Sequence, residues 1–324
     1  MSRFGYVGAE PTNDNTTNTG AFSVSDLNNL HESGDLKSSS FTCDFLVVGG
    51  GGAGGNASPG GGGGAGGVVT SVGNNGGGSS LETALTLSPN VDYNVAVGAG
   101  ASGYTTIGGG SVFHNIRVIG GGTGWRSNIA CGGASGGGGG YAFNYTNTGE
   151  GVIRSTGNRS ETFGGAGLQG YDGNRTSYES YNSLGGGGGA GASNTVTDQG
   201  AIGVISNIAA HGTADVGEVS GSNVYFGAGG GASHNNSATS GGTGGGGDGG
   251  VNTVNSGTAN TGGGGGGRWN GTPGSGGSGA IVLLYPDHLT CTAGAGVTAS
   301  AENAESSSKK SIAITAGTGT VSFS

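Results

Sequence analysis

The side chains best suited to recognition gather in residues 141–184, between two glycine blocks. This segment holds half of the ten tyrosines, and arginines are interspersed there among asparagines and serines. Tyrosine and arginine dominate binding surfaces because they offer large amphipathic contact areas with few torsions. The same side chains could instead cover the glycine blocks and fill gaps beside them. The residues predicted to contact a partner are Tyr145, Tyr171, Arg175, Tyr178 and Tyr181.

Two further aromatic–cation pairs lie beside glycine blocks, Trp125 with Arg126 and Trp269 with Arg268. An indole ring next to a guanidinium group suits stacking on a sugar or a cation–π contact. Packing against the glycine blocks is the alternative here too. Trp125 and Trp269 therefore join the predicted contact residues.

Catalytic motifs are present only in superficial form. Residues 133–137 match G-x-S-x-G around Ser135, but that motif works as a strained turn between a strand and a helix. Glycines follow Ser135, where a helix would be needed. Matches to G-x-G-x-x-G likewise lack a βαβ context. We predict that the chain is not an enzyme and has no cofactor.

The sequence also offers few residues suited to metal binding or disulfide formation. The five histidines have no ligand spacing, and residues 244–248 match only part of a calcium-binding repeat, which Thr243 interrupts. We therefore predict no metal. Cys43, Cys131 and Cys291 are too few and too scattered for a disulfide framework, so we expect small buried thiols.

The composition excludes several protein classes. Glycine occupies 85 of 324 positions, but it comes in blocks rather than at every third position, which rules out collagen. The net charge is −9, and no lysine occurs between Lys37 and Lys309, so nucleic acid is not an expected partner. The longest aliphatic run, residues 280–285, is far too short to span a membrane.

Apolar runs beside the glycine blocks predict short β-strands. We expect strands at residues 43–48 and 68–72, and a hairpin of residues 84–87 and 92–97 around a turn at 88–90. Residues 280–285 are continuously apolar, which is typical of a strand buried on both faces, and we pair this strand with residues 45–48.

The two ends of the chain differ from the glycine-rich centre. In residues 25–34 a serine precedes apolar residues three apart and a glycine follows, which predicts one short helix in an otherwise extended arm. Residues 311–315 alternate in polarity, residues 316–319 are turn-like, and residues 321–323 alternate again. This pattern predicts a C-terminal β-hairpin.

The glycine blocks must either remain flexible linkers or order together. Ordering a glycine costs roughly 0.5–1 kcal/mol more than ordering alanine. Extended threefold helices of the polyproline II type project their N–H and C=O groups sideways, so adjacent glycine helices could bond to one another. We predict an all-β fold with extensive irregular structure, in which short strands frame a packed polyglycine II layer. The expected units are an arm (1–40), a glycine-rich domain (41–286) and a hairpin tail (287–324).

The order of these motifs resembles the glycine-rich domain of bacteriophage virion proteins, particularly those of marine phages and cyanophages. The likeness rests on residues 45–52, 95–100 and 276–286. Residues 2–11 are similar to an N-terminal segment of cyanophage-type structural proteins, and residues 317–323 to phage tail-protein endings. The resemblance implies an arm that docks on other virion proteins through Phe4, Tyr6, Val7 and Pro11.

A more distant similarity is to the fibre-tip adhesins of T-even-type phages, in which packed polyglycine II helices carry receptor-binding loops. The resemblance implies a tail-fibre or fibre-tip adhesin that is assembled in the host cytoplasm. Its partners would be other virion proteins and a host-surface glycan or outer-membrane protein, and it would be a homo-oligomer, with a trimer favoured. The alternatives are a capsid or tail decoration protein with a mechanical role and a bacterial glycine-rich matrix protein.

Overall fold

The computed structural model describes residues 12–13, 18–19, 40–56, 59–103, 106–124, 132–138, 169–173, 185–192, 198–208, 216–234, 238–305 and 308–324. The helix predicted at 25–34 and the predicted docking residues Phe4, Tyr6, Val7 and Pro11 lie outside these ranges.

Short β-strands make up the regular structure of the described residues, as predicted, and the longest helix there is the 3₁₀ turn η1 (Gly76–Gly78). The strands are β1 (Thr12–Asn13), β2 (Asn18–Thr19), β3 (Phe41–Val48), β4 (Val68–Thr70), β5 (Leu85–Leu87), β6 (Tyr93–Ala96), β7 (Ser111–Phe113), β8 (Ile116–Val118), β9 (Val204–Ile205), β10 (Glu218–Ser220), β11 (Asn223–Phe226), β12 (Ala280–Pro286), β13 (Cys291–Ala293), β14 (Val297–Ala299), β15 (Asn303–Ala304) and β16 (Lys309–Phe323).

Most strands join one antiparallel sheet, which we call the rolled sheet. Its main order is β4-β3-β12-β16-β6-β7-β8, while β13, β14 and β15 also pair with β16, and β5 pairs with β3. The sheet curls until it is nearly closed. Gln169 bridges the two outer strands: its carbonyl accepts from Val68, its amide donates to the Arg117 carbonyl at 3.0 Å, and its Oε1 accepts from the Ile119 N–H at 2.9 Å.

The predicted pairing of residues 280–285 with 45–48 is confirmed. Strands β12 and β3 are antiparallel, with Ile281 opposite Val47 and Leu283 opposite Phe45. The predicted hairpin of residues 84–87 and 92–97 is wrong, because β5 pairs with β3 whereas β6 pairs with β16 and β7. The strands form where the apolar runs predict them, but they pair with more distant strands and place Leu87, Tyr93 and Val95 in one shared core.

The predicted C-terminal hairpin is also wrong. Residues 309–323 form one continuous strand, β16, which pairs first with β12 and then with β6. The register shifts between Thr298 and Ala299 of the neighbouring strand β14, and Gly317 has φ of +99°. A bulge with a glycine bends a strand without reversing it. The turn-like residues therefore carry the tail across the rolled sheet instead of folding it back.

Two apolar cores lie on the two faces of β3 and β12. Phe45 and Val47 point into the rolled sheet, together with Ile281, Leu283 and Tyr285 and the tail residues Ile312, Ile314, Val321 and Phe323. Leu46 and Val48 point outward, where they pack against Phe226 of the small sheet β10-β11-β9. The predicted burial of residues 280–285 on both faces is confirmed, and the tail completes the inner core.

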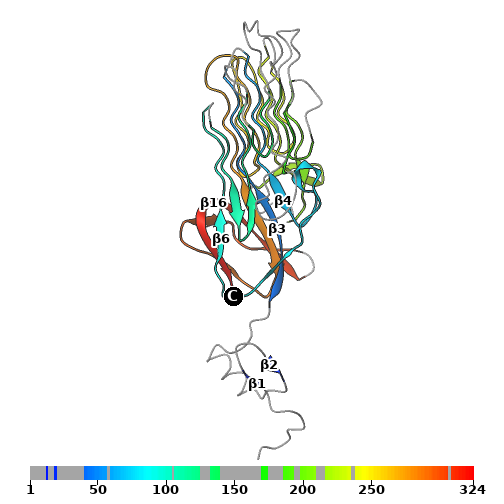
Figure 1. Ribbon diagram of the computed structural model, residues 1–324, viewed down its shortest axis with the longest axis vertical. Helices are drawn as coiled ribbons and strands as arrows, with labels where there is room; N and C mark the ends of the chain where they lie inside the picture. The colour runs from blue at the N-terminus through cyan, green and yellow to red at the C-terminus, as the bar shows by residue number, and fades with distance from the viewer. Residues whose placement is uncertain are drawn as a thin grey trace, which may run out of the picture.

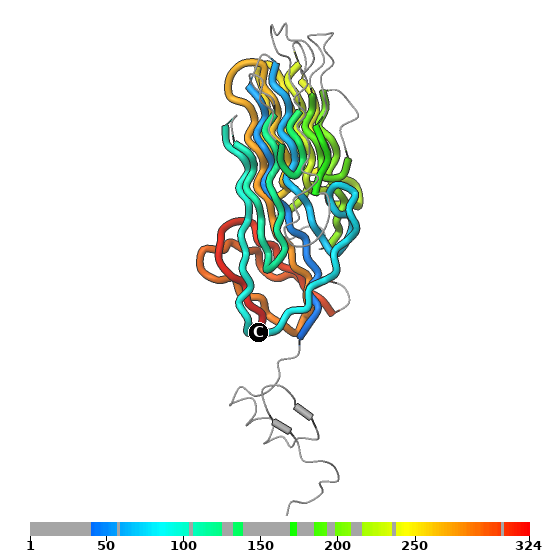
Figure 2. The backbone as a smooth tube through the Cα atoms, in the orientation of Figure 1, coloured from blue at the N-terminus to red at the C-terminus, as the bar shows by residue number. Residues whose placement is uncertain are grey.

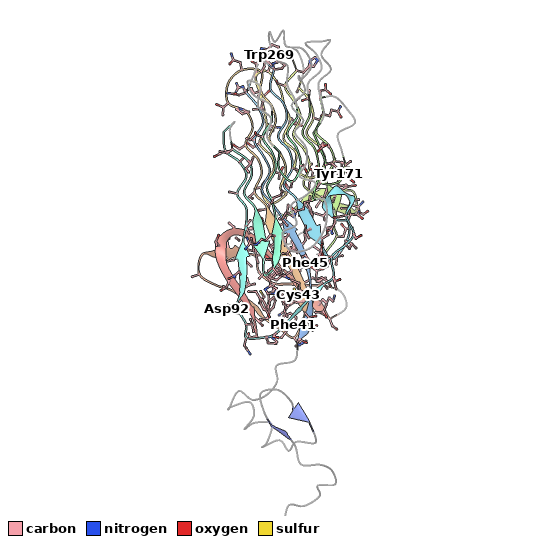
Figure 3. The ribbon with its side chains drawn as sticks, viewed as in Figure 1. Phe41, Cys43, Phe45, Asp92, Tyr171 and Trp269 are labelled. Carbon is pink, nitrogen blue, oxygen red and sulfur yellow. The ribbon has the colours of Figure 1, made fainter. Side chains whose placement is uncertain are left out.

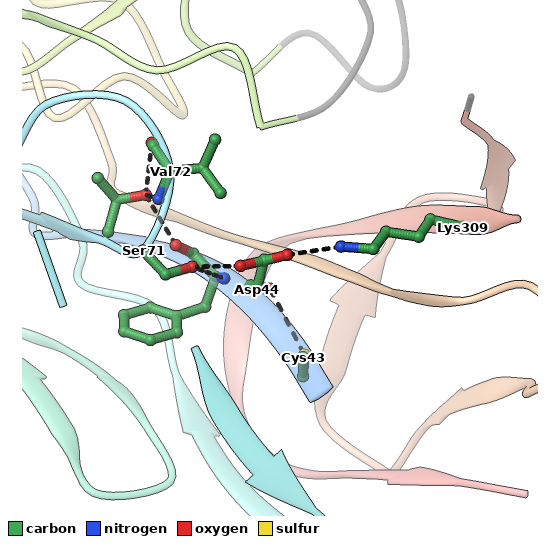
Figure 4. Close-up of polar contacts among 7 residues, drawn as sticks. Cys43, Asp44, Ser71, Val72 and Lys309 are labelled. Carbon is green, nitrogen blue, oxygen red and sulfur yellow. Dashed lines mark hydrogen bonds and ion pairs between the residues drawn. The ribbon is translucent and has the colours of Figure 1, made fainter. Parts of the chain in front are cut away.

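A polar contact ties strands β3 and β16 to the segment after β4 (Figure 4). The Asp44 carboxylate accepts from the Ser71 hydroxyl at 3.0 Å and pairs with the Lys309 ammonium at 2.8 Å. The Ser71 hydroxyl in turn accepts from the Phe45 N–H at 3.0 Å. Because Lys309 is more than one third exposed, this ion pair contributes little to stability.

The glycine runs extend from the rolled sheet as a bundle of extended, parallel-lying segments (Figure 2). The N–H groups of the run 60–67 point in turn at the runs 185–190, 262–267 and 119–124, and return to the same neighbour at every third residue. The bonds, at 2.8–3.1 Å with the donor first, are Gly62 to Gly185, Ala65 to Gly188, Gly63 to Gly265, Gly66 to Gly262, Gly64 to Gly122 and Gly67 to Ile119.

The carbonyl groups of the same run accept from three other runs, 49–55, 132–138 and 227–233. A helix with three residues per turn that donates to three neighbours and accepts from three others is a polyglycine II helix in hexagonal packing. The predicted layer is therefore present. A Cβ atom at Gly52, Gly187 or Gly264 would overlap a backbone carbonyl of a neighbouring run, so glycine is required at these contacts.

Candidate functional site

The described body has two distinct ends (Figure 1). Residue 41, where β3 begins, and the C-terminus lie at the end formed by the rolled sheet, whereas loops that join the glycine runs lie at the opposite end. We define the distal loops as residues 55–56, 59–60, 250–255 and 267–274. Backbone bonds hold these loops side by side, from Arg268 to Gly55 at 2.9 Å and from Trp269 to Gly250 at 3.2 Å.

Arg268 fixes the shape of the loop that carries Trp269. Its guanidinium group donates to the carbonyls of Thr272 at 3.3 Å and Asn252 at 3.2 Å. The group lies against Gly271, whose φ of +116° strongly favours glycine. The Arg268 Nε is covered and has no hydrogen-bond partner. Trp269 is thus held on a rigid loop with its side chain partly exposed.

Tyr171, the other predicted contact residue that the structure describes, lies elsewhere (Figure 3). Its N–H donates to the Gly189 carbonyl at 3.0 Å, and its own carbonyl accepts from Gly136 at 3.1 Å. The ring is partly buried, and its hydroxyl lies over Gly78 near the rolled sheet. For Tyr171 these contacts favour the packing alternative.

The structure therefore does not bring Tyr171 and Trp269 together. The other predicted contact residues, Trp125, Tyr145, Arg175, Tyr178 and Tyr181, lie outside the described residues. Sequence reasoning missed Asn56 and Asn252, which lie in the distal loops beside Arg268. The sequence feature that could have identified them is their position within two residues after a glycine run. That position alone does not reveal at which end of the bundle the run stops.

The described residues considered above for catalysis and for disulfide formation lie buried in the fold. Ser135 of the G-x-S-x-G match is fully buried within the glycine layer, and its Oγ has no hydrogen-bond partner. Cys43 and Cys291 are buried free thiols, as expected, while Cys131 lies outside the described ranges. In the part of the chain that the structure describes, no cluster of three or more His, Cys, Asp or Glu could hold a metal ion.

A cluster of ionisable and polar groups lies in the rolled sheet around Glu302. Its Oε1 accepts from the Tyr285 hydroxyl and the Cys291 N–H, both at 2.6 Å, and its Oε2 pairs with Lys310 at 2.8 Å. Burial opposes ionisation of Glu302, but these donors outweigh burial and lower its pKa. Burial raises the pKa of Tyr285, and it raises the pKa of Cys291 to about 12. Through these contacts Glu302 links Tyr285 of β12, Cys291 of β13 and Lys310 of β16.

The chain belongs to the glycine-rich domain family, whose model matches residues 33–286. The match confirms the expected glycine-rich domain and names no virion or receptor. No curated protein and no solved structure gives a significant match. Among the described residues, no helix combines the length and apolar character needed to cross a membrane.

Proposed function

We propose that this chain is a non-enzymatic virion structural protein of a bacteriophage, a tail-fibre or fibre-tip adhesin that attaches to the host cell through its distal loops and through the contact residues predicted in the segment 174–184. The observation that carries the proposal is the separation of the two ends. The segment 1–40, which resembles a virion-docking arm, joins the body at Phe41 in the rolled sheet, while the distal loops lie at the opposite end of the glycine layer.

The glycine layer suits this role because it is stiff without a large side-chain core. Each run lies in a lattice of backbone hydrogen bonds, and each bond contributes about 1 kcal/mol net. Loops on such a scaffold are presented with little conformational freedom, which lowers the entropic cost of binding. Their sequences can also vary without disturbing the lattice, because the packing contacts come from glycine backbone.

Adsorption measurements test the proposal. Arg175→Ala combined with Tyr178→Ala, in the segment between the glycine runs ending at 173 and starting at 185, should weaken adsorption of the purified protein to host cells. The loss should exceed about a hundredfold if both are hot spots, while the melting temperature stays nearly unchanged. The matched control is Ile107→Ser, on a side chain 54% exposed along the layer, which should adsorb normally.

The rival is a capsid or tail decoration protein, which the stiffness of the layer also favours. This rival requires no host receptor. Normal adsorption of virions after residues 174–184 are replaced by a glycine–serine linker, and after Fab fragments cover the distal loops, would favour the decoration role. Gold-labelled antibodies against the chain would then locate it on the capsid or the tail.

A further inference from the structure

The distal loops have a surface chemistry unlike that of the rest of the body. Every large hydrophobic side chain of the described residues that is more than 40% exposed lies outside these loops: Leu81, Val91, Ile107, Ile202 and Val219. The exposed distal side chains are instead the amides and hydroxyls of Asn252, Thr253, Asn255, Asn270 and Thr272, and the partly exposed apolar ones are Trp269, Val251 and Val254.

We infer that Trp269, with the amide and hydroxyl groups of Asn252, Asn270 and Thr272, forms a carbohydrate-contact site. This inference rests on the proposed adhesin function and names the class of its receptor as a surface polysaccharide. The buried centres of protein–protein interfaces are enriched in aromatic residues, whereas Trp269 is the one aromatic residue of the distal loops as defined above. A sugar instead presents C–H faces to an aromatic ring and hydroxyl groups to neighbouring amides.

The geometry around Trp269 supports a platform that exists before the ligand arrives. The backbone N–H of Trp269 donates to the Gly250 carbonyl, and Arg268 donates to the carbonyls of Asn252 and Thr272, so hydrogen bonds tie the two loops to each other. Arg268 acts here as a positioning residue, because its two terminal guanidinium nitrogens donate to backbone carbonyls of both loops. The indole ring and the exposed amides are then already arranged for a ligand that binds weakly per contact.

Treatments that destroy either the sugars or the proteins of the cell surface distinguish a polysaccharide receptor from a protein receptor. Host cells are treated either with periodate, which cleaves vicinal diols of sugars, or with a protease, and adsorption of the purified full-length protein is measured. We expect periodate to abolish adsorption and protease to leave it intact. Loss after protease with adsorption retained after periodate would overturn the carbohydrate inference and leave the adhesin function standing. Failure of the wild-type protein to adsorb even to untreated cells would overturn both.

A second measurement assigns the site. Polysaccharide extracted from an adsorbing strain is immobilised on beads. Trp269→Ala should bind it about tenfold more weakly than the wild type. Trp269→Tyr, which keeps an aromatic face, should retain most of the binding. The matched control is Tyr225→Ala, a partly exposed aromatic of the small sheet near the rolled sheet, which should bind normally. Equal bead binding by Trp269→Ala and the wild type would overturn the assignment.

Discussion

Gly264 lies so close to the run 60–67 that a Cβ atom there would overlap the Gly63 carbonyl oxygen. Gly264→Ala should therefore separate two runs that are fixed on all other sides. We expect a loss of about 1–3 kcal/mol, the usual range for overpacking, seen as a lower melting temperature. Ala99→Val is the matched control, because Ala99 is exposed on an outer run. Equal melting temperatures would contradict close packing of the layer.

Glu302 should make stability depend on acid pH. Its pKa is lowered in the folded chain, whereas the unfolded chain titrates near the ordinary value of about 4.3. Below that value the unfolded state takes up a proton first, so the stabilisation by Glu302 is present above about pH 4.3 and is lost as pH falls through the folded pKa. Glu302→Gln should flatten the urea-midpoint profile in this acid range. A profile parallel to that of the wild type would show that Glu302 is not the group responsible.

At the scale of elements, Gln169 closes the rolled sheet. Its side chain bonds to the backbone on both sides of Val118 at the end of β8, and its carbonyl accepts from β4. Gln169→Ala should leave the Ile119 N–H and the Arg117 carbonyl without their side-chain partner, which costs about 1–3 kcal/mol, and should speed hydrogen exchange at Ile119. Gln169→Glu keeps the acceptor for Ile119 but loses the donor to Arg117, so Ile119 should stay protected. Unchanged hydrogen exchange at Ile119 in Gln169→Ala would argue against the bridging role of Gln169.

The tail shows how an element is decided by its surroundings. Residues 311–323 have the alternation of a hairpin, and an isolated hairpin is marginal in water. As one strand, β16 instead pairs with β12 and β6 and places Ile314 and Phe323 in the inner core. Phe323 alone meets the rings of Phe41 and Tyr285 at about 5 Å. Longer ladders and this burial outweigh a local turn.

For the whole molecule, we predict that residues 1–40 are dispensable for folding of the body. Among the described residues, both apolar cores are built from Phe41 onward. A chain lacking residues 1–40 should therefore keep the melting temperature of the full chain but fail to incorporate into virions. A large drop in melting temperature would show that the segment belongs to the body, and normal incorporation would contradict its docking role.

The sequence by itself determined the local features of this protein. Glycine blocks without side chains can order only by bonding to one another, so composition allowed two outcomes, flexible linkers or the packed polyglycine layer that we predicted. The apolar residues of 43–48 predicted a strand, and the continuous apolar run 280–285 predicted a strand buried on both faces, because such a run has no polar face to expose. Their mutual pairing followed because each borders the glycine region.

Only the tertiary structure decided which segments meet. The partners of β5, β6 and β16, and the Gln169 bonds to residues 50 positions away, depend on distant chain segments that compete for the same backbone groups. The direction of each glycine run also decides at which end its loop emerges. That direction placed Trp269 with Asn252 at the distal end and Tyr171 beside the rolled sheet, although both aromatic residues border glycine runs in the sequence.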